Sequence, residues 1–338
     1  MAKVNIPSFK LNDGRSIPAL GYGTWLGLDE KSEFQLKDAP KLIEALSYGI
    51  DIGYRHIDTA HLYRLEPEVG QVVREKVAAG IKREDLFVTT KVWHQYHREA
   101  DVEVAARDSL RRLGLDYVDL LLIHWPMSIS VDGVDEKIDY LETWRGIESV
   151  QRKGLAKSIG VSNFNVAQLQ RLLANCTVEP VVNQVEINLN NGQNELVSYC
   201  QANDIVVVGY TTFGSMLRSD APLDLQPKAD NATLVAIAKK YGKTVTQVTL
   251  RYLYQRGVVT IPKTLSKARA LENASIFDFE LDKDDVATIA KFDNGYRTVV
   301  PAFWQDYENY PLEKIPDFTM KIPPSLMTWK NGVNQDID

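Results

Sequence analysis

The chain has 338 residues, of which 44% are hydrophobic and 25% are charged, so it can bury a large core in one or two domains. The formal net charge of −6 offers no basic excess for nucleic acid or for an anionic membrane surface. The first residues lack the pattern of a secretory signal, no apolar run of about 18 residues occurs, and the two cysteines form no CxxC pair. We therefore expect a cytoplasmic protein with no disulfide framework and no nucleic-acid or membrane partner.

Short apolar runs of β-strand type alternate with amphipathic helical patterns along the chain. Leu42 and Leu46 show the helical spacing in the first connection, and Asn165 and Asp230 are predicted helix starts. Eight β/α repeats in a chain of this length predict an α/β fold of the (β/α)8 TIM-barrel type, because open doubly wound sheets usually have fewer strands. One domain, residues 1–338, accommodates them. The predicted strands cover residues 19–23, 54–59, 86–91, 117–124, 156–162, 181–186, 205–210 and 258–262.

Further elements are predicted outside the eight repeats. Residues 7–18, with the turn sequence Asn12-Asp13-Gly14 at their centre, predict an N-terminal β-hairpin at the barrel bottom. Extra helices are expected at 231–241, 245–255 and 282–292.

A long segment without helical or strand period follows the last predicted helix. Residues 294–338 are rich in proline and aromatic residues, and so long an irregular segment on a compact domain is usually functional or disordered. We expect residues 300–318 to pack as a loop over the barrel mouth. The polar end of the chain, about residues 328–338, is expected to be a flexible tail.

Four titratable residues are candidates for catalysis. Asp58 and Lys91 lie at the ends of predicted strands, His124 closes the apolar run YVDLLLIH, and Tyr63 follows Asp58 by five residues in the same loop. The carboxyl ends of parallel strands meet around the barrel axis, so three successive strands deliver these groups to the same end. Each residue alone has an ordinary structural explanation, as a loop charge, an ion-pair partner, a helix cap or a near-core histidine. Their joint placement favours an active site.

These side chains are suited to reducing a carbonyl group. A tyrosine is a poor acid near neutral pH because its unperturbed pKa is about 10, but a neighbouring lysine cation favours the phenolate and lowers that pKa. Asp58 can keep Lys91 charged and oriented. Tyr63 and His124 can then polarise the carbonyl and stabilise the negative charge that grows on its oxygen. The set lacks only a hydride source, which a nicotinamide cofactor supplies.

Seven stretches carry a more specific resemblance: GYGTW at 21–25, GYRHIDTAHLY at 53–63, LFVTTKVW at 86–93, DYVDLLLIHWP at 116–126, KSIGVSNF at 157–164, VVNQVEIN at 181–188 and IPKTLSKARALEN at 261–273. Through them the chain resembles the aldo-keto reductase superfamily over essentially its whole length. This resemblance implies that Asp58, Tyr63, Lys91 and His124 correspond to the catalytic tetrad, with Tyr63 as proton donor. It also implies a monomer, as most members of the superfamily are.

The cofactor site is expected at later strands. A Rossmann fingerprint is absent, since GYGTWLG has the wrong spacing for GxGxxG and the Tyr-x-x-x-Lys pattern occurs only at 310–314, in the irregular tail. Polar residues instead follow the later strands, namely Ser162, Asn163, Gln184 and Tyr210. The resemblance implies that they hold the nicotinamide carboxamide and stack on its ring. A helix cap at Asn163 and a buried backbone contact at Gln184 are the structural alternatives.

A phosphate site is predicted where IPKTLSKARALEN leaves the last strand and enters a helix. Lys263 and Arg269 can bind a 2′-phosphate, Arg269 through a bidentate fork, while Glu272 and Asn273 lie within a helical turn of Arg269 and can meet the adenine. NADPH/NADP+ is therefore expected rather than NADH, with a solvated charge cluster as the alternative. Further expected cofactor contacts are Thr264 in the same stretch and, by resemblance, Thr24, Thr211, Phe213 and Ser215.

Aromatic side chains near strand ends and in the C-terminal segment predict an apolar substrate pocket. We expect a small-molecule aldehyde or ketone on a bulky hydrophobic body, such as a steroid or ecdysteroid ketone. A general reductase of aldehydes or other ketones fits the residues equally well. The candidate wall residues are Trp25, Trp93, Trp125, Phe303, Trp304 and Tyr310.

Three places depart from the common pattern of the superfamily: Leu65, INLNNGQ at 187–193 in place of the frequent CHPYLNQ, and TTF at 211–213 in place of a Ser-x-Leu triplet. None touches the tetrad, but they affect the substrate wall and the loop over the cofactor. The INLN variant and the extended tail resemble those of insect members that reduce ecdysteroid ketones such as 3-dehydroecdysone.

Two other classes of function remain open at the level of sequence. A metal-dependent barrel hydrolase would need a cluster such as HID at 56–58 with His61 and His124, although Lys91 would then place a cation near the metal. A non-catalytic, nucleotide-binding regulatory subunit can use the same barrel, but the complete tetrad argues against it.

Overall fold

The computed structural model describes residues 3–28, 33–219, 221–319, 321–323 and 326. All eight predicted strands are present, as β3 (Gly21–Gly23), β4 (His56–Asp58), β5 (Phe87–Val92), β6 (Val118–Ile123), β7 (Ala156–Ser162), β8 (Val182–Glu186), β9 (Val206–Tyr210) and β10 (Val258–Thr260). They form one sheet in the order β10-β9-β8-β7-β6-β5-β4-β3, and Leu20, next to β3, forms a parallel bridge with Thr260 of β10. The first and last strands therefore meet, and the predicted (β/α)8 barrel is confirmed.

Helices alternate with these strands, and local capping signals set where several of them begin. The helices are α1 (Ala39–Ile52), α2 (Glu66–Ala78), α3 (Glu99–Leu113), α4 (Tyr140–Arg152), α5 (Val166–Leu173), α6 (Asn194–Ala202), α7 (Ala232–Tyr241), α8 (Val245–Gln255), α9 (Lys267–Ala274) and α10 (Lys283–Ala290). The extra helices α7, α8 and α10 occur where they were predicted. Asn165, and not Asn163, caps α5 through a capping box with Gln168.

The predicted start of α7 at Asp230 was wrong by one residue. Asn231 is the cap, because its side-chain oxygen accepts the N–H groups of Thr233 and Leu234 in the first turn. None of the helices among the described residues is long and apolar enough to cross a membrane.

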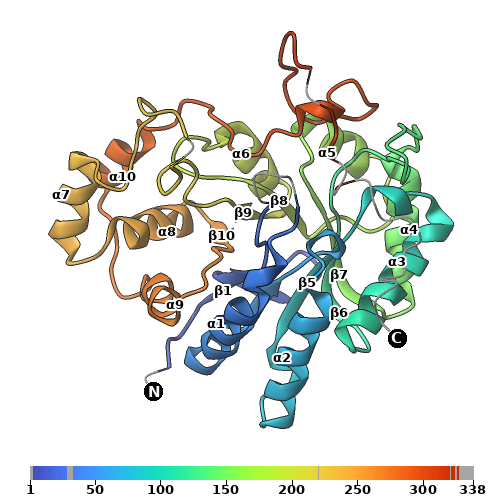
Figure 1. Cartoon of the computed structure of the whole chain (residues 1–338), viewed down its shortest axis with the longest axis horizontal. Helices are drawn as coiled ribbons and strands as arrows, with labels where there is room; N and C mark the ends of the chain where they lie inside the picture. Colours follow the sequence, from blue (N-terminus) through green and yellow to red (C-terminus); the bar gives the residue numbers. More distant parts are fainter. Residues whose placement is uncertain (1–2, 29–32, 220, 320, 324–325, 327–338) are drawn as a thin grey trace. The chain divides into compact units, whose positions relative to one another are not determined.

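The chain divides into two compact units. Unit 1 contains residues 1–23, 44–57 and 182–299, and unit 2 contains residues 24–43, 58–181 and 300–338. Within unit 2, β5, β6 and β7 run parallel, α3 and α4 pack against them, and α2 packs against α3 (Figure 1). Every residue of β5 is buried, and its Val and Thr side chains suit a strand that is covered on both faces.

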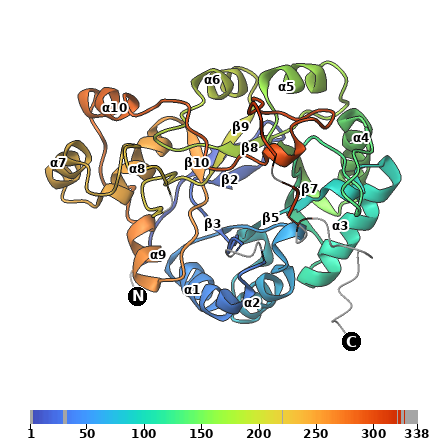
Figure 2. The same cartoon turned by 45° about the horizontal axis from the view of Figure 1, so that its top comes forward.

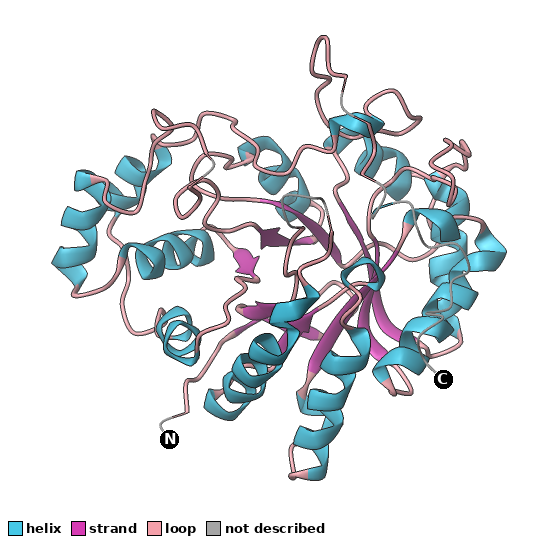
Figure 3. Cartoon of the chain, in the orientation of Figure 1, coloured by secondary structure: helices cyan, strands magenta, loops and turns pink. Residues whose placement is uncertain are grey.

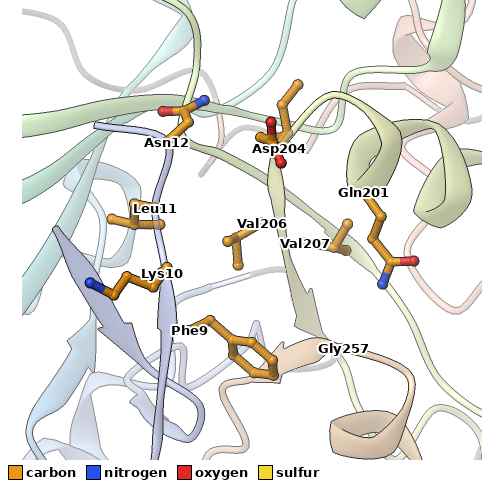
Figure 4. Close-up of a pocket in the computed structure, with 10 residues that line it drawn as sticks. Phe9, Lys10, Leu11, Asn12, Gln201, Asp204, Val206, Val207 and Gly257 are labelled. Carbon is orange, nitrogen blue, oxygen red and sulfur yellow. The ribbon is translucent and has the colours of Figure 1, made fainter. Parts of the chain in front are cut away.

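The N-terminal hairpin belongs to unit 1. Its strands β1 (Ser8–Lys10) and β2 (Ser16–Pro18) pair antiparallel, as predicted. Figure 4 shows residues 9–12 lining a pocket together with Val206, at the start of β9, and Gly257, which immediately precedes β10. The hairpin therefore lies at the amino ends of these strands, which is the bottom of the barrel.

As predicted, the C-terminal segment is irregular over its described residues up to 323, apart from the single turn η5 (Ala302–Trp304) (Figure 3). In unit 2 it lies beside the start of α5 (Figure 2), where the Gln168 side chain donates to the carbonyl of Asn309 (2.8 Å). The Trp304 ring lies 4.5 Å from that of His94, just beyond the carboxyl end of β5. The segment therefore covers the carboxyl end of this strand, whereas the predicted tail at 328–338 falls outside the described residues.

Candidate active site

Lys91 is the buried centre of the predicted tetrad. Its Nζ donates to Asp58 Oδ1 (2.6 Å), to the carbonyl oxygen of Thr59 (2.9 Å) and to Tyr63 Oη (3.4 Å), which accounts for the three N–H groups of the ammonium. The side chains of Lys91 and Asp58 are 0% and 2% exposed. Burial lowers the pKa of Lys91, and the Asp58 carboxylate acts in the opposite direction. The ammonium is therefore fixed with one N–H group directed at Tyr63.

Tyr63 contacts this buried ion pair and is itself partly exposed to solvent. It ends the single-turn helix η2 (His61–Tyr63), which stops there because Arg64 adopts a left-handed conformation (φ 56°). Its ring lies 5.0 Å from that of Trp25, and the residue is only half-buried, unlike Lys91. Tyr63 thus has one side toward the ammonium and a surface that a substrate can reach.

His124 completes the cluster directly after β6. Its ring centroid lies 5.8 Å from that of Tyr63 and 5.0 Å from that of Trp93. Burial, and then the positive charge of Lys91, holds the pKa of His124 well below its usual range, so the imidazole is neutral. A neutral imidazole can donate one N–H to a substrate oxygen without competing with Tyr63 as the acid.

The structure brings the four predicted side chains together within unit 2, and their surroundings do not resemble a metal site. His61, which the metal alternative required, directs Nδ1 at the guanidinium of Arg112 (2.7 Å). Across the part of the chain that the structure describes, no group of three His, Cys, Asp or Glu side chains is arranged to hold a metal ion. What the cluster can do is donate a proton from a phenol and stabilise the phenolate with a fixed cation.

Two of the predicted cofactor residues in unit 2 support the backbone of the tetrad. Asn163, in a left-handed conformation (φ 63°), donates through Nδ2 to the carbonyl of His124 (2.9 Å) and to Ser162 Oγ (3.2 Å). Thr24 Oγ1 donates to the carbonyl of Asp58 (2.9 Å). Asn163 and Thr24 therefore hold the strand ends that carry the catalytic candidates.

In unit 1, further predicted cofactor residues lie in and after β8 and β9. Gln184 is buried in β8, and Tyr210 ends β9 half-buried. Burial raises the pKa of the Tyr210 phenol well above its usual range, so it stays protonated. Thr211 adopts a left-handed conformation (φ 50°), which turns the chain sharply into the loop containing Phe213 and Ser215.

The predicted phosphate site lies around the start of α9 in unit 1. Ser266 caps the helix, and its Oγ accepts the N–H of Arg269 (3.4 Å). The side chains of Lys263 and Arg269 are exposed, so two cations stand near a helix N-terminus. This donor set suits an anion such as a phosphate group.

The other predicted residues of this stretch are buried or already hydrogen-bonded to neighbouring side chains. Glu272 Oε1 accepts from the hydroxyls of Thr244 (2.7 Å) and Thr246 (2.8 Å), at the start of α8. Thr264 and Asn273 are almost fully buried. Glu272 therefore already has two donors in this structure, which the sequence alone did not indicate.

The segment 187–193, which we call the asparagine turn, joins neighbouring loops of unit 1. The sequence analysis identified it only as a departure from the common pattern of the superfamily. The side chain of Asn190 accepts from Ser215 Oγ (2.8 Å) and donates to the carbonyls of Gln226 and Phe292. Its backbone carbonyl accepts the N–H groups of Asn294 and Tyr296, both at 3.1 Å. One asparagine thus joins the loop after β9 to the segment after α10.

Glu186, at the end of β8, anchors the next part of the segment that follows α10. Glu186 Oε1 accepts the N–H of Thr298 (2.7 Å), and Oε2 accepts the N–H of Val299 (2.8 Å). Asn188 Nδ2 also donates to Oε1 (3.0 Å). Burial raises the pKa of Glu186, and the backbone N–H groups partly oppose that effect.

The predicted aromatic residues of unit 2 fall into two groups. Trp304 is 3% exposed and packs against Trp93 (6.0 Å), Trp125 (6.5 Å) and Phe303 (4.8 Å). Trp93 and Trp125 are also nearly fully buried, so Trp93, Trp125 and Trp304 form a packed aromatic cluster. The half-buried residues, which have surface for a substrate, are Trp25, Phe303 and Tyr310.

Comparisons with known proteins identify the family of the chain. The model of the Aldo/keto reductase family matches residues 19–294. The solved structure of silkworm (Bombyx mori) aldo-keto reductase AKR2E5 in complex with NADPH is 65% identical, with a TM-score of 0.93, over 97% of this chain and 100% of that chain.

Two curated relatives are also similar over most of their length. Aldo-keto reductase AKR2E4 from Bombyx mori is 43% identical over 91% of this chain and 99% of its own, and 3-alpha-hydroxysteroid dehydrogenase from Rattus norvegicus is 38% identical over 89% and 96%. The chain therefore belongs to the aldo/keto reductase family of oxidoreductases.

Proposed function

We propose that the chain catalyses the NADPH-dependent reduction of an aldehyde or ketone to an alcohol, with Tyr63 as the proton donor. The observation that carries this proposal is the set of hydrogen bonds made by Lys91 Nζ. Two of its N–H groups are bound to Asp58 and to the Thr59 carbonyl, and the third is directed at Tyr63 Oη (3.4 Å). A buried cation that is held by these partners beside a half-buried phenol stabilises the phenolate that remains after proton transfer.

Each tetrad residue has a separate task in this mechanism. Tyr63 Oη donates its proton to the carbonyl oxygen, and Lys91 stabilises the negative charge left on the phenol. Asp58 keeps the ammonium charged although it is buried. The neutral His124 donates a hydrogen bond to the same substrate oxygen and so fixes the orientation of the carbonyl. The bound nicotinamide supplies the hydride.

NADPH is the cofactor that the residues of this chain fit. In unit 1, the exposed Lys263 and Arg269 stand at the capped start of α9 and suit the 2′-phosphate. The related AKR2E5 was solved with NADPH, and AKR2E4 with NADP. In unit 2, Ser162 and Asn163 present polar side chains for a carboxamide next to the tetrad.

For the substrate we propose a carbonyl on a bulky, apolar body, such as a steroid or ecdysteroid ketone. Trp25 and Phe303 offer half-buried aromatic surface, and Trp25 lies directly beside Tyr63. The name of the relative 3-alpha-hydroxysteroid dehydrogenase supports a steroid-like ketone. A general aldehyde reductase would use the same tetrad.

The test is a panel of aromatic aldehydes, quinones and ketosteroids, in which reduction is followed by the loss of NADPH absorbance. Tyr63→Phe should lower kcat by about 10²-fold or more, since general acid catalysis contributes about that much, while the Kd for NADPH stays within about twofold. Tyr117→Phe is the matched control, because Tyr117 also lies beside cations, Arg83 and Lys157, but at the amino end of β6. Full activity of Tyr63→Phe would refute the assignment.

A further inference from the structure

A second buried cluster of polar and charged side chains lies beside the tetrad in unit 2, and the proposed mechanism does not use it. This support cluster consists of His61, Glu66, Thr90 and Arg112. Arg112 Nε donates to Glu66 Oε2 (2.7 Å), and Arg112 Nη2 lies within ion-pair distance of the same oxygen (2.7 Å). Arg112 Nη2 also lies 2.7 Å from His61 Nδ1 and donates to Ser109 Oγ (3.2 Å). Thr90 Oγ1 donates to Glu66 Oε1 (2.6 Å). The side chains of Arg112 and Glu66 are only 6% and 1% exposed.

The chain connects this cluster to the catalytic candidates at two points. His61 begins the single turn η2 that ends at Tyr63, so the ring that Arg112 holds and the proposed proton donor share one short helix. Thr90 precedes Lys91 in β5, so the hydroxyl bound to Glu66 belongs to the strand end that carries the ammonium. The support cluster therefore fixes both segments whose side chains must meet at 3.4 Å.

The protonation state of the cluster follows from its chemistry. Arginine stays protonated and can only donate, so His61 Nδ1 must accept, and the ring proton then lies on Nε2. Burial, followed by the charges of Arg112 and Arg64, holds the pKa of His61 well below its usual range. The Glu66 carboxylate also favours the charged form of Lys91. Because Glu66 and Arg112 neutralise each other, they add no net charge next to the tetrad.

We propose that Arg112, Glu66 and His61 are positioning residues for carbonyl reduction, which hold the Tyr63 turn and the end of β5 so that Tyr63 Oη meets Lys91 Nζ. The inference rests on the proposed role of Tyr63 as the proton donor. The alternative is that the buried ion pair only stabilises the fold, since a buried pair that loses one partner is destabilising whatever its function.

The experiment compares Arg112→Met with Arg111→Met in the full chain, using NADPH and 4-nitrobenzaldehyde. Arg111 is the matched control because it is the adjacent residue of α3 but is 65% exposed and pairs with Asp108. Arg112→Met should lower kcat by about 10- to 100-fold, because a displacement of about 1 Å can cost that much, while the Kd for NADPH stays within about twofold. Arg111→Met should leave both values unchanged.

A double variant separates positioning from stability. Arg112→Met together with Glu66→Gln removes both charges, so it should recover most of the Tm that either single variant loses. Its kcat should stay low, because His61 still lacks the donor that orients it. Recovery of kcat in parallel with Tm would overturn the proposal and assign the cluster to stability alone.

Arg112→Lys keeps the test decisive if Arg112→Met does not fold. A lysine can pair with Glu66 but lacks the fork that also reaches His61, so kcat should fall by about three- to tenfold in a folded protein. Wild-type kcat in Arg112→Lys would overturn the inference. Full activity of Tyr63→Phe would instead refute the proposed function, so the two failures are distinguishable.

Discussion

Unit 2 and unit 1 hold their functional segments by different means. In unit 2, buried ion pairs do so: the side chains of Lys91 and Asp58 are 0% and 2% exposed, and those of Arg112 and Glu66 are 6% and 1% exposed. In unit 1, ion pairs such as Lys240 with Asp282 lie at the surface, with both side chains about half exposed. The loops there are joined instead by the amide of Asn190 and by backbone N–H groups that donate to the Glu186 carboxylate.

The difference follows from what each region must do. A buried charge carries a large desolvation cost, and it is useful where charge develops during a reaction, as on the phenol of Tyr63. A neutral amide has two donors and an acceptor, so it can join several backbone segments without imposing a field. Substitutions of the buried charges should therefore reduce catalysis, whereas substitutions in the asparagine turn should reduce stability.

Lys91→Met should give the largest effect and test the first half of this comparison. It removes the cation beside Tyr63, so kcat should fall by about 10²- to 10⁴-fold, and the unpaired Asp58 should lower the free energy of unfolding by about 3–5 kcal/mol. Lys157→Met is the control, because that cation lies over the Tyr117 ring, near the amino end of β6. Single-turnover oxidation of NADPH and urea unfolding measure the two quantities. A kcat within twofold of wild type would contradict the comparison.

The sequence predicted the elements that local patterns encode. The eight strands, the extra helices and the meeting of Asp58, Lys91 and His124 at strand ends all follow from apolar runs and from the geometry of parallel strands. The family assignment was confirmed as well. The roles of the site residues, the monomeric state and the cytoplasmic location stay predictions.

The contacts that the sequence did not predict join residues far apart in the chain. Asn190 meets Phe292 at a separation of 102 residues, and Arg112 meets Glu66 at a separation of 46. Periodicity reports which face of an element is buried, but it does not say which distant polar group will satisfy a buried amide or guanidinium. The burial of Trp304, a predicted wall residue, has the same origin, because its neighbours come from other segments.

Asn190→Ala tests the second half of the comparison. It leaves Ser215 Oγ and the carbonyls of Gln226 and Phe292 without their amide partner, so the free energy of unfolding should fall by about 2–3 kcal/mol. The control is Asn203→Ala, in the same unit, which removes only a bond to the carbonyl of Tyr199, four residues earlier. Urea unfolding measures the loss. A decrease in kcat as large as that of Lys91→Met would remove the distinction between the two regions.

Arg269→Ala refines the comparison between the two units. It removes from unit 1 an exposed charge that we propose binds the 2′-phosphate of NADPH. The Kd for NADPH should rise about tenfold, the value of one solvent-exposed charge-assisted contact, while the Kd for NADH stays nearly constant. Lys267→Ala is the control, since Lys267 lies on the same helix and pairs with Glu44. Fluorescence titration with both cofactors decides. Equal weakening of NADPH and NADH would mean that Arg269 does not recognise the 2′-phosphate.

Unit 2 should also respond to acid through its buried histidines. Burial lowers the pKa of His94 to about 3 and holds those of His61, His97 and His124 well below the usual range. In the unfolded chain a histidine binds a proton below about pH 6.5, whereas these four stay neutral in the fold. Their contribution to stability is therefore complete above that pH and is lost as the pH falls toward the folded pKa.

His97→Leu measures one part of that loss. His97 is fully buried, and neither ring nitrogen has a hydrogen-bond partner among the described residues, so an apolar side chain fits its surroundings. Between pH 6.5 and 5, the free energy of unfolding should fall less steeply in the variant than in the wild type, by about 1 kcal/mol per pH unit, the effect of one proton. Buried carboxyls with raised pKa values, Glu186 and Asp119, act in the opposite sense, but they are the same in both proteins and cancel in the difference. Identical slopes would mean that His97 takes up its proton without unfolding.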